Sequence, residues 1–247
     1  MQQSQPGSKS GTLAPLKNVT TCLDVAFRII DQPAGVDRLG MFFGPSGYGK
    51  SKASTYLQNK VRAAYFEVFD FWTRKVFVES LLIELGGKPR GTIAHMMMEI
   101  LERLRDDPDR LIIIDEADKL VDKGMIELVR DVYKGAGVPV LLVGEEQLPQ
   151  KLASYERCAN RVTAYGMANP CDLEDAIVLA RAYQPSIEIE EDLLRRILSA
   201  TNGVASRIVA SLNEVAQFAR ARRVSRVGLA GYDGTIFTGR APSRRAA

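Results

Sequence analysis

The stretch GPSGYGKS at residues 44–51 decides the fold of this 247-residue chain. It fits the pattern GxxxxGK[ST], in which the backbone N–H groups of a glycine-rich loop turn inward around phosphate oxygens. An apolar run at 38–44 and a helical pattern from about 49 to 60 place it between a strand and a helix, as a phosphate-binding P-loop requires. The predicted binding residues are Gly44, Pro45, Ser46, Gly47, Tyr48, Gly49, Lys50 and Ser51.

The residue types in this loop suit the binding of phosphate and Mg²⁺. Side chains at Gly47 or Gly49 would obstruct the approach of phosphate to the backbone. Lys50 adds a positive charge at the β- and γ-phosphates, and the Ser51 hydroxyl is suited to bind Mg²⁺. The helix that follows directs the positive end of its dipole at the anion.

A second motif, LIIIDE at 111–116, ends in two carboxylates. Its continuous β-branched run is typical of a strand buried on both faces of a parallel sheet. We expect Asp115 beside the P-loop, where it orients Mg²⁺ through water, and Glu116 facing the γ-phosphate, where it polarises the attacking water. The two motifs together predict nucleotide hydrolysis. The letters DEAD at 115–118 do not indicate a helicase of that name, because the chain has no room for two RecA-like domains.

The pattern of strands and helices predicts an α/β fold with a parallel sheet covered by helices on both faces. After Pro170 the pattern becomes purely helical, which predicts a small helical lid. One helix is expected over about 122–134, and no strand is expected within the lid. The predicted parts are a flexible segment 1–18, an α/β core 19–170, a lid 171–223 and a basic tail 224–247.

Composition excludes several function classes. No run reaches the roughly 18 apolar residues of a membrane span, and the N-terminus lacks the apolar core of a secretion signal. Three well-separated cysteines and a single histidine argue against a disulfide framework or a structural zinc site.

Charge is distributed unevenly along the chain. The net charge is +3, but residues 218–247 hold seven arginines against one aspartate, so this segment carries +6 and the remainder −3. Such a tail neutralises nucleic-acid phosphates or is simply a solvated terminus, and composition does not separate the two.

With these motifs, residues 18–220 resemble the AAA+ ATPases. Within that group the chain is similar to the transposition ATPases, namely the phage Mu B protein, TnsC and the IstB/TniB group. The run VPVLLVG at 138–144 and the segment DFWTRK at 70–75, followed by an apolar helix, carry this likeness. The resemblance implies ATP and Mg²⁺ as cofactors and a head-to-tail filament or ring on duplex DNA. It also implies delivery of that DNA to a transposase, in the bacterial cytoplasm at the nucleoid.

The resemblance also assigns roles to single residues. Glu145 stands at the sensor 1 position, where the family usually has Asn, Ser or Thr, so γ-phosphate sensing there departs from the pattern. Arg161 matches the arginine finger that reaches a neighbouring subunit's nucleotide, and Arg157 is the second choice. Arg207 matches the sensor 2 arginine of the lid.

Basic residues in loops and in the tail are the candidate DNA contacts, with a solvated charge as the alternative for each. Trp72 is interpreted as a core anchor rather than a base-stacking residue. The candidates are Thr73, Arg74, Lys75, Lys88, Arg90, Arg222 and Arg223, together with Arg244 and Arg245 farther along the tail.

Two alternative functions remain open at this point. The first is a helicase loader or replication initiator, which keeps the ATPase and changes the client. The second is a nucleotide-gated DNA scaffold without hydrolysis, which the unusual Glu145 suggests.

Overall fold

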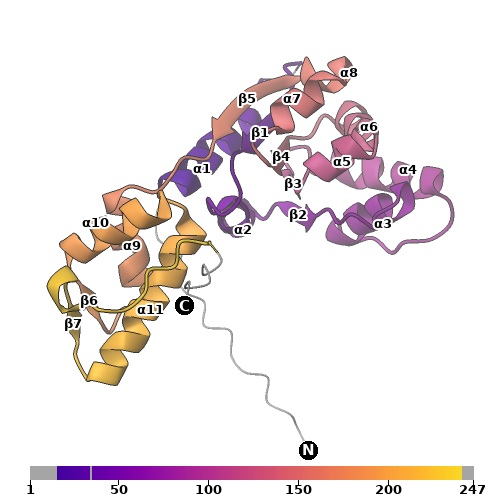
Figure 1. Cartoon of the computed structure of the whole chain (residues 1–247). Coiled ribbons are helices and arrows are strands. Elements are labelled where there is room, and N and C mark those ends of the chain that lie inside the picture. The colour runs from indigo at the N-terminus through magenta and orange to yellow at the C-terminus, as the bar shows by residue number, and fades with distance from the viewer. Residues whose placement is uncertain (1–15, 34, 241–247) are drawn as a thin grey trace, which may run out of the picture. The chain divides into compact units, whose positions relative to one another are not determined.

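The computed structural model describes residues 16–33 and 35–240, which form two compact units (Figure 1). The first unit is Lys17–Asn169, and the second comprises residues 170–240 together with Leu16. Across these ranges no helix has both the length and the apolar character needed to cross a membrane.

A five-stranded parallel sheet in the order β2-β3-β4-β1-β5 forms the centre of the first unit. Every residue of β3 and β4, two of the three inner strands, is buried, which explains their uninterrupted apolar runs. The predicted α/β architecture is therefore confirmed. The strands are β1 (Leu39–Phe43), β2 (Ala64–Glu67), β3 (Ile112–Asp115), β4 (Val140–Gly144) and β5 (Val162–Met167).

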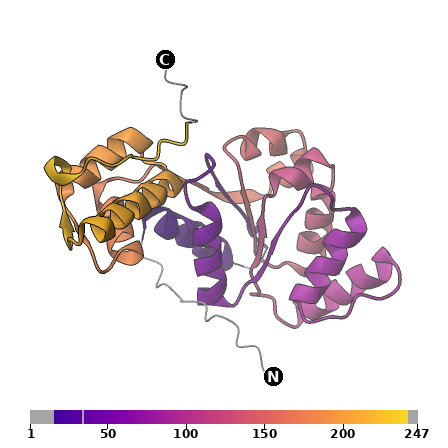
Figure 2. The ribbon, with the colours of Figure 1, turned by 60° about the horizontal axis from the view of Figure 1, so that its bottom comes forward.

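Helices cover both faces of this sheet (Figure 2). Helices α1 and α2 pack together on one face, and α3, α4 and α6 lie as neighbours on the other. The helices of the first unit are α1 (Lys17–Ile30), α2 (Lys50–Val61), α3 (Arg74–Glu84), α4 (Ile93–Arg105), α5 (Asp118–Asp122), α6 (Ile126–Ala136), α7 (Leu148–Ala153) and α8 (Glu156–Ala159).

The helix expected over about 122–134 corresponds to α6, which begins at Ile126, and the short helix α5 that precedes it was not predicted. The N–H of Gly124 donates to the carbonyl of Val121, and the N–H of Met125 donates to that of Leu120. This pair of bonds, with Gly124 at a φ of +62°, is the Schellman ending of a helix.

The second unit contains the three helices expected of a lid, and also a short parallel strand pair that the sequence pattern did not predict. Apolar side chains from all three helices share one core. Its elements are α9 (Leu173–Tyr183), β6 (Glu188–Ile189), α10 (Glu191–Thr201), α11 (Ala205–Arg222), β7 (Arg226–Val227) and the 3₁₀ turn η1 (Leu229–Gly231).

The segment after Arg223, where the sequence shows little core-forming pattern, packs against α11. The ring of Tyr232 meets that of Phe218 edge to face, with centroids 5.1 Å apart. The N–H of Phe237 donates to the Ser211 hydroxyl at 3.0 Å. This part of the basic segment is thus packed into the second unit as far as Phe237.

Candidate active site

The P-loop connects β1 to α2 at the carboxyl edge of the sheet. Gly47 and Gly49 both adopt a φ of +84°, a left-handed conformation in which a side chain would be strained. The Lys50 ammonium donates to the carbonyls of Gly44 at 2.7 Å and Pro45 at 3.0 Å, so its charge lies over the loop. The loop therefore has a phosphate-binding conformation, and α2 begins directly after it with its N-terminus at the loop.

Four carboxylates lie within electrostatic reach of Lys50. Burial lowers the pKa of Lys50, while the negative charges of Asp115, Glu116, Glu145 and Asp118 act in the opposite direction. The carboxyl ends of β1, β3 and β4 meet at one edge because the strands are parallel. Asp115 and the P-loop follow strands that are separated by β4, and among these carboxylates Asp115 has the largest electrostatic effect on Lys50.

Asp115 ends β3 with only 1% of its surface exposed. Its Oδ1 accepts the backbone N–H of Glu116 at 2.9 Å, and its Oδ2 accepts the hydroxyl of Tyr65, on the neighbouring strand β2, at 3.0 Å. Burial, followed by the charge of Asp115, raises the pKa of Tyr65, so the hydroxyl stays protonated and remains a donor. No motif in the sequence marks Tyr65.

Glu116 takes a left-handed φ of +57°, which is unusual for a residue with a side chain. Such a conformation costs about 1–3 kcal/mol and is typical of functional positions. The Glu116 carboxylate pairs with the Lys119 ammonium at 3.3 Å and is partly exposed. The turn thus presents a carboxylate to solvent directly beyond the buried Asp115.

The available ligands suit Mg²⁺. The Ser51 hydroxyl, exposed in the first turn of α2, and the Asp115 carboxylate are hard oxygen donors. Protein sites for Mg²⁺ usually supply one or two carboxylates and leave the other positions to phosphates and water. Within the described ranges no cluster of three or more His, Cys, Asp or Glu side chains is placed to hold a metal. The residues therefore fit an ion held jointly by the protein and a nucleotide.

Glu145 directly follows β4, and its side chain is exposed. Its backbone N–H donates to Asp118 Oδ2 at 2.6 Å. A Cβ on the preceding Gly144 would stand 2.2 Å from the same oxygen, so only glycine leaves room for this bond. Burial raises the pKa of Asp118. The last residue of the DEAD run therefore fixes the end of β4, a role that the sequence analysis missed.

Asn18 is a second residue that the sequence analysis missed. Its buried side-chain amide donates to the carbonyls of Tyr48 at 2.9 Å and Asn169 at 2.8 Å, and its oxygen accepts the N–H of Asn169 at 2.9 Å. The sequence placed residue 18 in a flexible segment. The structure instead begins α1 at Lys17 and uses Asn18 to join the P-loop to the last residue of the first unit.

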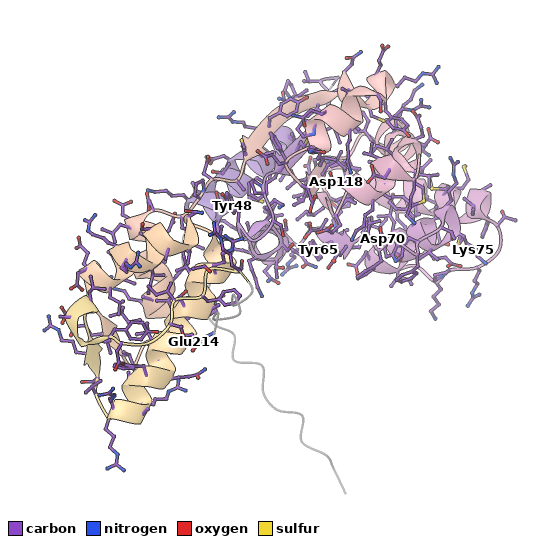
Figure 3. The ribbon with its side chains drawn as sticks, viewed as in Figure 1. Tyr48, Tyr65, Asp70, Lys75, Asp118 and Glu214 are labelled. Atoms are coloured by element: carbon purple, nitrogen blue, oxygen red, sulfur yellow. The ribbon has the colours of Figure 1, made fainter. Side chains whose placement is uncertain are left out.

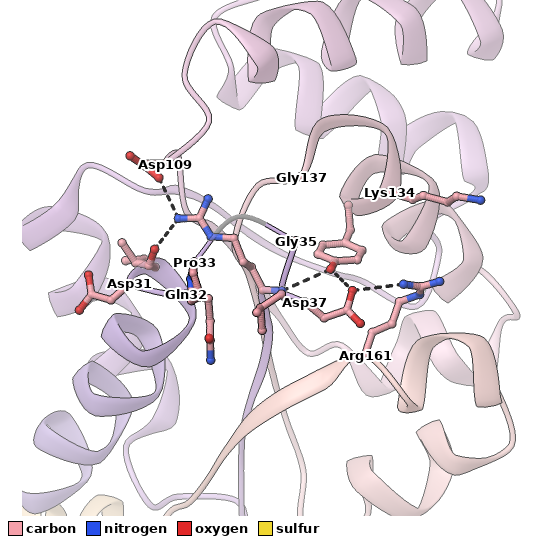
Figure 4. A pocket seen from close by; sticks show the side chains of 13 residues that line it. Asp31, Gln32, Pro33, Gly35, Asp37, Asp109, Lys134, Gly137 and Arg161 are labelled. Carbon is pink, nitrogen blue, oxygen red and sulfur yellow. Dashed lines mark hydrogen bonds and ion pairs between the residues drawn. The ribbon is translucent and has the colours of Figure 1, made fainter.

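Arg161 lies at the opposite edge of the sheet from the P-loop, because it precedes β5 whereas the P-loop follows the parallel strand β1. Its guanidinium pairs with Asp37 at 3.2 Å (Figure 4). It also donates to the Arg157 carbonyl at 3.0 Å. The Tyr133 hydroxyl also donates to Asp37. Arg161, Asp37 and Tyr133 line a cavity of about 570 Å³, while the Arg157 side chain is exposed on α8.

Arg207 lies in the first turn of α11, and its side chain is half-buried. Gly239 passes close to it, since a Cβ there would stand 2.6 Å from the Arg207 Nε. Its sensor 2 role remains a prediction. Arg222, a candidate DNA contact, pairs with Asp233 at 3.0 Å and lies 5.2 Å from the ring centroid of Phe218.

The candidate DNA residues after β2 are exposed, but each already makes a contact within the protein. The Thr73 hydroxyl caps α3 by accepting the N–H of Val76, so it already has a structural role. Arg74 donates to the Gly124 carbonyl at 3.3 Å, and Lys75 pairs loosely with Glu79 at 3.6 Å.

The remaining candidates lie either on the surface or beyond the residues that the structure describes. Lys88 and Arg90 are exposed between α3 and α4, and Arg223 is exposed at the end of α11. Trp72 is buried and stacks on Phe66, as its interpretation as a core anchor requires. Arg244 and Arg245 lie outside the described residues.

Comparison with known proteins agrees with this geometry. Residues 35–152 match the family model of an AAA domain. This segment, just under half of the chain, is similar to an AAA domain. It contains the P-loop, Asp115, Glu116 and Glu145, whereas the end of β5 lies outside it. No curated protein sequence matches the chain significantly.

Solved structures extend the likeness of the fold beyond the AAA domain. ORC2 of Aeropyrum pernix, solved with ADPNP and ADP, has a TM-score of 0.65 at 12% identity, covering 89% of this chain and 68% of that one. Cdc6p of Pyrobaculum aerophilum has a TM-score of 0.65 at 17% identity, and the match covers 89% of this chain and 66% of that one. ORC1 of Aeropyrum pernix, solved in complex with DNA, has a TM-score of 0.62 at 12% identity, with coverages of 88% and 63%. At these identities the likeness establishes the AAA+ fold.

Proposed function

We propose that the AAA domain binds ATP with Mg²⁺ at the carboxyl edge of its sheet and hydrolyses it. The observation that carries this proposal is the convergence of the closed P-loop, the doubly hydrogen-bonded Asp115 and the strained Glu116 around Lys50. ATP binding would transfer the Lys50 ammonium from the loop carbonyls to phosphate oxygens. Ser51 and Asp115 would hold Mg²⁺, which neutralises phosphate charge when bound.

In the proposed reaction a water molecule attacks the γ-phosphorus and forms the new P–O bond. The bond to the bridging oxygen of ADP breaks, and ADP leaves with inorganic phosphate as the second product. Glu116 accepts the proton of the attacking water, which suits a partly exposed carboxylate beside the site.

The positions of the arginines support head-to-tail assembly as part of this proposal. Arg161 and the exposed Arg157 precede β5 at the amino edge, so either one serves as a finger only for the nucleotide of another copy. A contact between unlike faces generates a ring or a helical filament. In this proposal Asp37 holds Arg161 until a neighbour is present.

DNA is the proposed partner of the ATP-bound assembly. Exposed cations follow β2 and α3, and the similar ORC1 structure was solved with DNA. The likeness to ORC and Cdc6 favours a client of the replication-initiator or helicase-loader type. Delivery of target DNA to a transposase is the second candidate, favoured by the segments 138–144 and 70–75.

Binding to long duplex DNA in ATP and in ADP tests this proposal. We expect assembly on DNA with ATP and little with ADP, whereas equal binding in both states would refute nucleotide control. Capture of a replicative helicase or a transposase from the native host separates the two clients.

A further inference from the structure

Two aromatic rings project from the turn that follows β2. Phe71 has 76% of its surface exposed, the largest fraction among the large apolar side chains of the described residues, and Phe69 has 43%. The two rings are nearly parallel, with centroids 5.7 Å apart and planes inclined by 15°. A single exposed apolar side chain is ordinary on a protein surface, but a stacked and exposed pair forms one larger aromatic surface, called the platform below.

The turn holds this platform in a fixed position. The N–H of Trp72 donates to the Phe69 carbonyl at 3.0 Å, and the N–H of Val68 donates to the Asp115 carbonyl at 3.0 Å. The Trp72 ring, itself buried, lies 6.0 Å from the ring of Phe69 and 6.0 Å from that of Phe66. The exposed pair is therefore the outer end of an aromatic series that begins in the core.

The charges beside the platform favour a polyanion over an apolar protein groove. Arg74 and Lys75 follow directly and are exposed, and residues 69–75 carry a net charge of +1 (Asp70 and Lys75 are labelled in Figure 3). Asp70 lies between the two rings in sequence and disfavours a phosphate at that point, which leaves the ring face for an uncharged group. Nucleobases offer such a group next to phosphates, and they stack on aromatic side chains whatever their sequence.

We propose that Phe71, supported by Phe69, stacks on the face of a nucleobase, while Arg74 and Lys75 contact the adjoining phosphates. This inference rests on the proposed DNA binding and adds its mode of contact. The base belongs either to an unpaired strand or to a base step opened within a duplex.

The test measures binding of the full chain, with a non-hydrolysable ATP analogue, to a labelled single strand and to its duplex over a range of salt concentrations. The variants are Phe71→Ala, Phe71→Tyr, which keeps the ring, and Lys75→Ala. Met98→Ala is the matched control, because Met98 is another exposed apolar side chain, at 64%, on α4. A fluorescent base analogue in the DNA reports stacking directly.

We expect Phe71→Ala to bind about tenfold more weakly with an unchanged salt slope, as loss of one base stack requires. Phe71→Tyr and Met98→Ala should bind like the wild type, and Lys75→Ala should lower the salt slope by about one. The stacking signal of the base analogue should disappear only in Phe71→Ala. A loss on either DNA form supports the proposal, and the form with the larger loss identifies the source of the base.

Two results would overturn the inference. If the wild type binds DNA and Phe71→Ala binds equally well, stacking by Phe71 is wrong while the proposed function stands. If Phe71→Ala changes only self-association, measured by sedimentation without DNA, the platform is a protein contact. Failure of the wild type itself to bind DNA would instead reject the proposed DNA partner, and this inference with it.

Discussion

Replacing Tyr65 by Phe removes one hydroxyl and leaves the ring. The Tyr65 hydroxyl donates to Asp115 Oδ2 at 3.0 Å, and the N–H of Glu116 donates to Asp115 Oδ1 at 2.9 Å. Asp115 is buried, so water does not readily replace the lost donor. We therefore expect Tyr65→Phe to free the carboxylate to rotate away from the orientation that suits Mg²⁺.

The expected size of the effect follows from the charge of the acceptor. A hydrogen bond to a charged group contributes about 1.5–3 kcal/mol. At about 1.4 kcal/mol per tenfold change in an equilibrium constant, this corresponds to roughly 10- to 100-fold. Loss of a partner that orients a metal ligand weakens metal affinity by the same range, about 10- to 100-fold.

The assay is binding of a fluorescent ATP analogue as a function of Mg²⁺ concentration. Tyr65→Phe should raise the half-saturating Mg²⁺ concentration at least about tenfold and leave binding in EDTA unchanged, because the P-loop itself is intact. Tyr183→Phe, in the exposed part of α9, is the matched control. An unchanged Mg²⁺ requirement in Tyr65→Phe would refute the positioning role.

Three further predictions concern stability and reactivity. Asn18→Ala removes three hydrogen bonds to the P-loop and to Asn169, so urea unfolding should show a loss of about 2–4 kcal/mol; a loss below about 0.5 kcal/mol would contradict the tie. Burial and the bond to Asp37 raise the pKa of Tyr133 to about 12. The contribution of the protonated Tyr133 hydroxyl to stability should thus be full below about pH 10 and be lost as pH rises through about 12. In unfolding measured at alkaline pH, Tyr133→Phe should weaken this pH dependence. Burial raises the pKa of all three thiols, so a thiol reagent near pH 8 should label none in the native chain and all three in urea; the cysteines are Cys22, Cys158 and Cys171.

Local patterns predicted the parts of the fold that are formed by neighbouring residues. The P-loop is one continuous stretch, and a strand buried on both faces is recognisable from its own apolar run, so β1, β3 and the position of Asp115 were accessible from the sequence. The break at Gly124 was not, because an isolated glycine in a helical pattern is also compatible with an unbroken helix.

Residues whose roles depend on distant partners were missed. Asn18 bonds to residues 30 and 151 positions away, and Tyr65 meets Asp115 only through the register of β2 with β3. The second unit shows the same limit, since Val227 is buried among the helices and pairs with Ile189, nearly 40 residues earlier. None of these contacts leaves a periodic trace in the sequence, which explains why the site was predicted as two motifs without the side chains that hold them.

The measurement that tests the central claim most directly is phosphate release from Mg²⁺–ATP by the wild type and by Glu116→Gln. Both proteins should bind the nucleotide equally, since Lys50 and the P-loop are unchanged. We expect turnover by the wild type and its near-complete loss in Glu116→Gln. Equal phosphate release by the two, or none from a wild type that binds ATP, would contradict hydrolysis at this site and favour a nucleotide-gated scaffold.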